Sequence, residues 1–153
     1  MSEIEELYRS LSHCEVCPHS CGVNRFENEV GTCGMPADIY VASYGPHFGE
    51  EPELVGYFGS GTIFLSGCNL LCVFCQNFTI SHCREGKFYT IQDLVEIMLD
   101  LQRMGCHNIN FVTPTHYSPQ LAKAIVEARS MGLTIPIVYN SSGYDKVERS
   151  EER

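Results

Sequence analysis

The chain has 153 residues, about one domain's length, and at 44% hydrophobic it can bury a core without covalent staples. Its 10 Lys and Arg against 19 Asp and Glu leave a net charge of −9, which argues against a nucleic-acid partner because phosphate binding needs clustered basic residues. The N-terminus MSEIEELYRSL is acidic where an export signal would be basic, and no apolar run is long enough to cross a bilayer. We therefore expect a soluble, cytoplasmic protein with no membrane partner.

Residues 1–60 are expected to form a Cys-rich N-terminal extension. Its first 36 residues contain turn formers such as Pro18 and Gly22, which predict an irregular segment. The stretches IYVASYG, at 39–45, and LVGYFG, at 54–59, predict two short strands or extended segments.

The extension contains four of the nine cysteines. In a cytosolic chain such a group favours metal binding, because the cytosol is too reducing for stable disulfides. Four thiolates can close a tetrahedral zinc site or hold a second iron–sulfur cluster, and both metals accept thiolate. Zinc, a cluster and free thiols stay open as alternatives for Cys14, Cys17, Cys21 and Cys33.

From residue 61 the pattern alternates between strands and helices. The runs TIFLS at 62–66, INFVT at 109–113 and IPIVYN at 135–140 predict buried strands. One helix is predicted after Thr90, which can form a capping box with Asp93, and a second is predicted to begin with Ser118 as its N-cap. This order predicts an α/β fold over residues 61–148, with a parallel sheet and crossover helices, followed by a tail at 149–153.

The loop SGCNLLCVFCQN directly follows the first of these strands and places Cys68, Cys72 and Cys75 at C-x3-C-x2-C. Loops at the carboxyl ends of parallel strands form the usual active-site face. A [4Fe–4S] cube has four irons, so three thiolates leave one iron open for chemistry. The alternative is a zinc site that the three cysteines share with His82 or Cys83.

This cysteine motif, with Phe74 before its last cysteine and a strand before its first, resembles the radical S-adenosylmethionine (SAM) superfamily. Longer blocks resemble the pyruvate formate-lyase activating enzyme-like proteins in particular, from about Cys14 to Glu148. These blocks are CPHSCGVNR, GTCG, FGEEPELVGYFGSGTIFLSGCNLLCVFCQN, GCHNINFVTPTHYSPQ and PIVYNSSGYDKVE.

The resemblance implies that Cys68, Cys72 and Cys75 bind three irons of a [4Fe–4S] cluster and that SAM ligates the fourth. An electron from a donor such as a flavodoxin or ferredoxin would then cleave SAM to methionine and a 5′-deoxyadenosyl radical. The radical would abstract hydrogen from a target, which the resemblance implies is a glycyl-radical protein. Phe74 would lie near the adenine.

Polar residues after the second and third strands are candidates for binding SAM. Thr113, Thr115 and His116 stand where many relatives carry a Gly-Gly-Glu segment for the amino group, and they can offer hydroxyl and imidazole groups. Asn140 and Ser142 could contact the ribose or carboxylate. The alternative for both segments is an ordinary turn.

Related enzymes build a partial (β/α)6 barrel, whereas this sequence predicts three of its strands. We therefore expect the N-terminal half of a radical SAM enzyme, truncated and with partial or no activity, whose third strand is an open edge. The competing hypothesis is an iron–sulfur or zinc binding module without radical chemistry.

Overall fold

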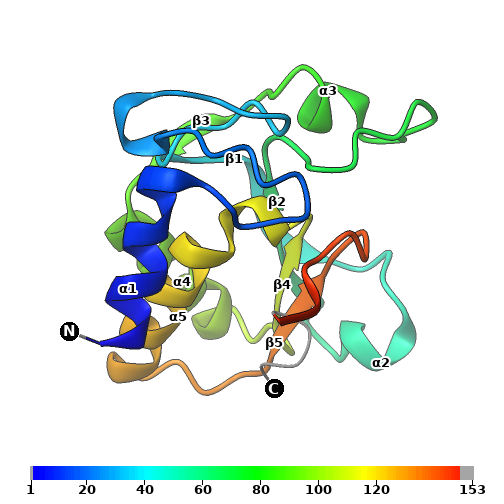
Figure 1. Ribbon diagram of the computed structural model, residues 1–153. Helices are drawn as coiled ribbons and strands as arrows, with labels where there is room; N and C mark the ends of the chain where they lie inside the picture. The colour runs from blue at the N-terminus through cyan, green and yellow to red at the C-terminus, as the bar shows by residue number, and fades with distance from the viewer. Residues whose placement is uncertain (1, 149–153) are drawn as a thin grey trace.

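The computed structural model describes residues 2–148, and the predicted tail at 149–153 lies outside them (Figure 1). A five-stranded sheet with strand order β3-β1-β2-β4-β5 forms the centre of the molecule. The strands are β1 (Ile39–His47), β2 (Ser60–Leu65), β3 (Lys87–Tyr89), β4 (Ile109–Val112) and β5 (Ile137–Asn140). The helices are α1 (Glu3–Arg9), α2 (Pro52–Val55), α3 (Phe78–Ser81), α4 (Ile91–Arg103) and α5 (Ser118–Ser130), and short 3-10 helices cover Ser10–His13, Arg25–Glu27 and Thr115–Tyr117. Each helix of the described part of the chain is too short or too polar to cross a membrane.

The strands predicted after residue 60 form the parallel half of the sheet. Gly61 of β2 pairs with Ile109 of β4, which in turn pairs with Ile137 of β5. Helices α4 and α5 connect these strands, as the predicted α/β pattern required. β5 lies at the edge of the sheet, which agrees with the expected open edge.

The other half of the sheet differs from the prediction, which specified a parallel sheet. β1 runs antiparallel to both β2 and β3, so the sheet is mixed and includes a strand from before residue 61. The strand predicted at LVGYFG is wrong. Residues 52–55 form helix α2, which Pro52 can start, and Gly56 takes a φ of 56° that ends it.

The main core lies between the sheet and the helices α4 and α5, which cover one face of it (Figure 1). Ile63 and Leu65 of β2 and Ile109 and Phe111 of β4 point into this core. Apolar stripes on the two helices meet them there, with Leu94, Ile97, Met98 and Leu101 from α4 and Leu121, Ala124 and Ala128 from α5. The 3.6-residue period of those stripes therefore decided which helix faces are buried.

The two long helices begin differently. Thr90 and Asp93 form the predicted capping box, in which each side chain accepts a hydrogen bond from the other residue's backbone N–H. The predicted Ser118 cap is wrong. The 3-10 helix Thr115–Tyr117 runs straight into α5, so Ser118 is already helical, and its buried hydroxyl finds no hydrogen-bond partner within the described residues.

The N-terminal extension is more regular than the sequence predicted. It opens with helix α1, which packs against α5, where Lys123 Nζ lies 3.0 Å from Glu5 Oε1 and 4.6 Å from the centre of the Tyr8 ring. Its own small core contains Leu11, Cys14, Val16 and Ala37. The Cys-rich loop that follows lies at the same end of the molecule as the loop after β2 (Figure 1).

Candidate metal centre

The loop after β2 starts at a sharp turn anchored to its neighbours. The Ser66 N–H donates to the carbonyl oxygen of Tyr40 at 2.9 Å, and the Ser66 hydroxyl donates to the carbonyl of Glu85 at 2.6 Å. Gly67 has a φ of +79°, and a Cβ there would collide with the Met35 side chain, whose Sδ would be 2.8 Å away. Glycine is therefore required at the point where the chain leaves the strand.

We call residues 66–77, between β2 and α3, the cluster loop. Cys68 is buried at its start, and its Sγ accepts a hydrogen bond from the Leu70 N–H at 3.3 Å. Cys75 Sγ accepts one from the Ser81 hydroxyl at 3.3 Å. The Cys75 N–H donates to the Cys72 carbonyl at 3.2 Å, which holds these two half-buried residues in one turn. Such donors stabilise a thiolate and tune a bound metal.

The chemistry of this donor set fits a thiophilic metal, because all three thiols belong to one short loop at the same edge of the sheet. Within residues 2–148, however, no three Cys, His, Asp or Glu side chains already stand together as a metal-ligating group. The thiols would therefore have to turn toward a common centre as they bind.

Apolar side chains project from the same loop into solvent. Val73 is 92% exposed and Phe74 is 86% exposed, far more than such residues usually are. Exposed apolar groups beside a polar site indicate a surface that a ligand covers. The structure thus leaves Phe74 accessible, as its predicted contact with a cofactor requires.

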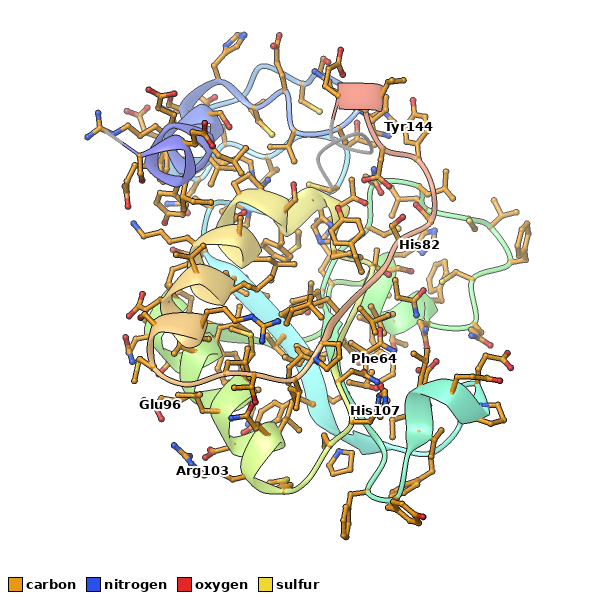
Figure 2. The ribbon with its side chains drawn as sticks, turned by 90° about the horizontal axis from the view of Figure 1, so that it is seen from below. Phe64, His82, Glu96, Arg103, His107 and Tyr144 are labelled. Atoms are coloured by element: carbon orange, nitrogen blue, oxygen red, sulfur yellow. The ribbon has the colours of Figure 1, made fainter. Side chains whose placement is uncertain are left out.

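The two alternative zinc ligands next to the loop, His82 and Cys83, differ in their surroundings. His82 stacks on Phe78 with ring centres 4.2 Å apart, and its Nδ1 shares a 2.7 Å hydrogen bond with the Ser81 hydroxyl. Cys83 is exposed. Figure 2 shows His82 and Phe64 on the side of the molecule away from the helix α4 that carries Glu96 and Arg103.

The structure brings Thr113 and Asn140 together at the carboxyl ends of β4 and β5. The Thr113 N–H donates to the Asn140 carbonyl at 3.0 Å, and Thr113 adopts a left-handed φ of 60°. The Thr115 hydroxyl donates to Asp145 Oδ1 at 2.7 Å. Ser142 is exposed. Asp145, which also accepts from the Tyr139 hydroxyl, is a residue that sequence reasoning missed.

His116 lies beneath the cluster loop. Its Nε2 donates to the Ser66 carbonyl at 2.8 Å, and its own carbonyl accepts from Arg25 Nη1 at 2.6 Å. Complete burial lowers the pKa of His116 to about 3; the Ser66 hydrogen bond opposes that shift and the Arg25 charge adds to it. The imidazole is therefore neutral, and its buried Nδ1 has no hydrogen-bond partner among residues 2–148.

Asn69 joins three parts of the chain at the cluster loop. Its carbonyl accepts from His19 Nε2 at 2.6 Å, and its Nδ2 donates to the Tyr144 carbonyl at 2.8 Å. The residue is 1% exposed, and its Oδ1 has no hydrogen-bond partner in the described part of the chain. Figure 2 shows Tyr144 at the end of the molecule where the N-terminal segment lies. The sequence offered no signal for these links, because their partners are 50 and 75 residues apart.

The N-terminal thiols meet at a second place. Cys14, Cys17, Cys21 and Cys33 line one cavity beside the cluster loop, together with His19, Arg25 and His116. Burial raises the pKa of the Cys33 thiol, against the lowering effect of the Arg25 charge, and the neighbouring Cys14 and Cys17 raise it further.

The family model of the Radical SAM superfamily matches residues 62–152, which is more than half of the chain. The chain therefore belongs to the radical SAM superfamily, as its cysteine motif predicted.

Two curated relatives, both from Methanocaldococcus jannaschii, are similar over most of this chain. The uncharacterized protein MJ0674 is 35% identical over 95% of the chain and 43% of its own length. The uncharacterized protein MJ0808 is 26% identical over 94% of the chain and 47% of its own length. The chain thus spans less than half the length of these relatives. No solved structure shows a significant match.

Proposed function

We propose that this chain binds a [4Fe–4S] cluster through Cys68, Cys72 and Cys75 and takes part in the reductive cleavage of SAM. The observation that carries the proposal is a loop with three thiols and no fourth, at the carboxyl end of β2, in a member of the radical SAM superfamily. When bound, the cluster supplies the electron that breaks the sulfonium C–S bond, giving methionine and a 5′-deoxyadenosyl radical.

The chain's own residues prepare this site in two ways. The Leu70 N–H and the Ser81 hydroxyl donate hydrogen bonds to the sulfurs of Cys68 and Cys75, and such donors orient metal ligands and tune a bound metal. The exposed apolar side chains of Val73 and Phe74 provide a surface for the adenine and keep water from the reacting sulfonium when it is covered.

The polar end of SAM is assigned to the neighbouring strand ends. Thr113 and Asn140, which meet through a backbone hydrogen bond, and the exposed Ser142 are proposed to contact its amino, carboxylate or ribose groups. Thr115 contributes with its hydroxyl oriented by Asp145. The Nε2–H of His116 is held by Ser66, so His116 acts by supporting the loop from below.

The finer parts of the proposal rest on the resemblance of the sequence blocks to pyruvate formate-lyase activating enzyme-like proteins. They are a glycyl-radical protein as the hydrogen donor, a flavodoxin or ferredoxin as the electron source, and a (β/α)6 partial barrel of which β2, β4 and β5 would be the first three strands. A glycyl-radical signal in a candidate partner, formed only with SAM and reductant, is the test of the first.

Anaerobic reconstitution with iron and sulfide tests the central claim. After reduction with dithionite, electron paramagnetic resonance should show a cluster signal that changes when SAM is added, and product analysis should show 5′-deoxyadenosine. A signal indifferent to SAM supports an iron–sulfur module without radical chemistry. Zinc in the cluster loop of oxygen-free material would overturn the proposal.

Two cysteine variants sharpen the test. Cys72→Ala should abolish the SAM-responsive signal, because it removes one of three ligands. Cys83→Ala is the matched control, since this exposed thiol is close in sequence but has no assigned role. A signal that responds to SAM only after Cys83→Ala would mean that this thiolate closes the cluster in the natural chain.

A further inference from the structure

The four N-terminal thiols surround one small cavity, although Cys33 follows the other three only after a further loop. Cys14, Cys17 and Cys21 follow the 3-10 helix Ser10–His13, and Cys33 comes from the stretch before β1. The backbone holds this arrangement, because the Cys14 N–H donates to the Val23 carbonyl and the Cys14 carbonyl accepts from Gly22, each at 2.9 Å.

The size of the cavity bears on the choice between zinc and a second iron–sulfur cluster, both of which the sequence left open. Its volume is about 20 Å³, which is room for one water-sized body and favours a single ion over a four-iron cube. Gly31 makes this close packing possible, because a Cβ there would lie 2.6 Å from Cys21 Cβ and collide with its sulfur. The space therefore fits a single ion.

The positive charge of Arg25 beside the cavity also favours thiolates there. Arg25 is 1% exposed, and within residues 2–148 it forms no ion pair with a carboxylate. Its Nη1 lies 3.9 Å from Cys14 Sγ. A buried cation without a counter-charge is strongly destabilising. A divalent ion held by four thiolates carries a net charge of −2 and would compensate Arg25.

Two histidines connect this cavity to the cluster loop. His19 and His116 both line it, and they donate to the carbonyls of Asn69 and Ser66, at 2.6 and 2.8 Å. These two carbonyls lie on either side of Cys68 in the sequence. Whatever fills the cavity is therefore placed to hold the start of the cluster loop.

We propose that the N-terminal thiols bind one zinc ion, and that this ion braces the N-terminal segment against the cluster loop. Because the described residues contain no ready-made ligand group, zinc binding draws the thiols inward and releases their protons to solvent. The ligands are Cys14, Cys17, Cys21 and Cys33.

The metal test uses the full chain with Cys68, Cys72 and Cys75 all changed to Ser, so that the cluster loop cannot contribute metal. Mass spectrometric analysis should find about one zinc per chain, as a closed four-thiolate site requires. A further Cys17→Ser and Cys21→Ser should remove it, whereas Cys83→Ser should not. The chain without Cys68, Cys72 and Cys75 cannot bind the SAM-cleaving cluster. A failure of the zinc site can therefore be distinguished from a failure of the proposed function.

Cobalt(II) substitution in the same chain keeps the proposal testable if a variant misfolds. Cobalt should give the absorption of a tetrahedral thiolate complex, and added zinc should displace it. Iron with sulfide in this background, or four thiols that stay free of metal, would overturn the proposal.

The bracing role rests on the zinc site and has its own readout. Removing zinc should raise hydrogen exchange of the Leu70 amide about tenfold, the loss expected when one supporting hydrogen bond is released, and leave β4 unchanged. His19→Ala should give the same increase while retaining zinc. Exchange that is indifferent to zinc would overturn the bracing role.

Discussion

The imidazole of His116 donates a hydrogen bond from Nε2 to the carbonyl oxygen of Ser66, 2.8 Å away and 50 residues earlier in the chain. This bond connects the turn after β4 to the last residue before Gly67, where the cluster loop leaves β2. It fixes one end of the loop from inside the protein, and it ties the loop to the protonation state of a buried side chain.

The first prediction is that acid destabilises the fold through His116. Its pKa is about 6.5 in the unfolded chain and falls to about 3 in the folded protein. Between these values the unfolded chain binds a proton that the folded one does not. The free energy of unfolding should therefore fall as the pH drops below 6.5, by up to about 1.4 kcal/mol per pH unit.

Denaturant titration at pH 7.5 and pH 5 measures this effect, and His116→Gln is its control. Gln can still donate to Ser66 but does not titrate. The free energy of unfolding of the variant should be about 1–3 kcal/mol below that of the natural chain at pH 7.5, and this difference should shrink at pH 5. If the deficit is the same at both values, His116 is not the group responsible.

The second prediction concerns the glycine at the start of the cluster loop. Gly67→Ala should lower stability and iron binding together, because it adds a collision with Met35 to the cost of a φ of +79°. Gly143 is the matched control, with a φ of +82° and nothing within 4 Å of an added Cβ. Gly143→Ala should therefore cost about 1–2 kcal/mol, and Gly67→Ala about 1–3 kcal/mol more. Equal losses in thermal melts would show that backbone conformation alone sets the requirement.

The third prediction concerns Gln102, which ties α4 to the segment before β5. Its Oε1 accepts from the Thr134 N–H at 2.7 Å, and its Nε2 donates to the Gly132 carbonyl at 3.0 Å. Gln102→Ala should lower the free energy of unfolding by about 0.5–1.5 kcal/mol, because it removes these hydrogen bonds while water can still reach the exposed backbone groups. Gln92→Ala, on the same helix, should change it by less than about 0.5 kcal/mol. A neutral Gln102→Ala in denaturant titrations would contradict the role assigned to these bonds.

The fourth prediction concerns the cap of α4. Thr90→Ala removes one half of the capping box with Asp93 and should cost about 1 kcal/mol at neutral pH. The hydrogen bonds from Thr90 lower the pKa of Asp93, so their contribution is present at neutral pH and is lost as the pH falls through that lowered pKa. Asp93→Asn should show a similar deficit in denaturant titrations. No change in either variant would mean that packing alone holds the start of the helix.

Local pattern was sufficient for the second half of the fold. The stripes of α4 and α5, the Thr90 cap and the strands β2, β4 and β5 follow from apolar period and short-range hydrogen bonds, which neighbouring residues decide among themselves. Three cysteines in one loop are likewise a local signal. Residue spacing therefore predicted the superfamily before any contact was known.

Long-range packing decided the rest. β3 is three residues long, which is too short for its sequence to predict a strand or its pairing with β1. The strand predicted at LVGYFG, residues 54–59, failed because Pro52 starts a helix before this stretch and Gly56, inside it, ends that helix.

The sequence by itself determined which residues can bind metal, because thiol chemistry and spacing are properties of the chain. The tertiary structure alone decided what surrounds them: Arg25 beside the N-terminal thiols, and His19 and His116 on the two carbonyls that flank Cys68. The physical reason is that a buried charge or imidazole takes its partners from wherever folding brings them, and sequence separation carries no record of that distance.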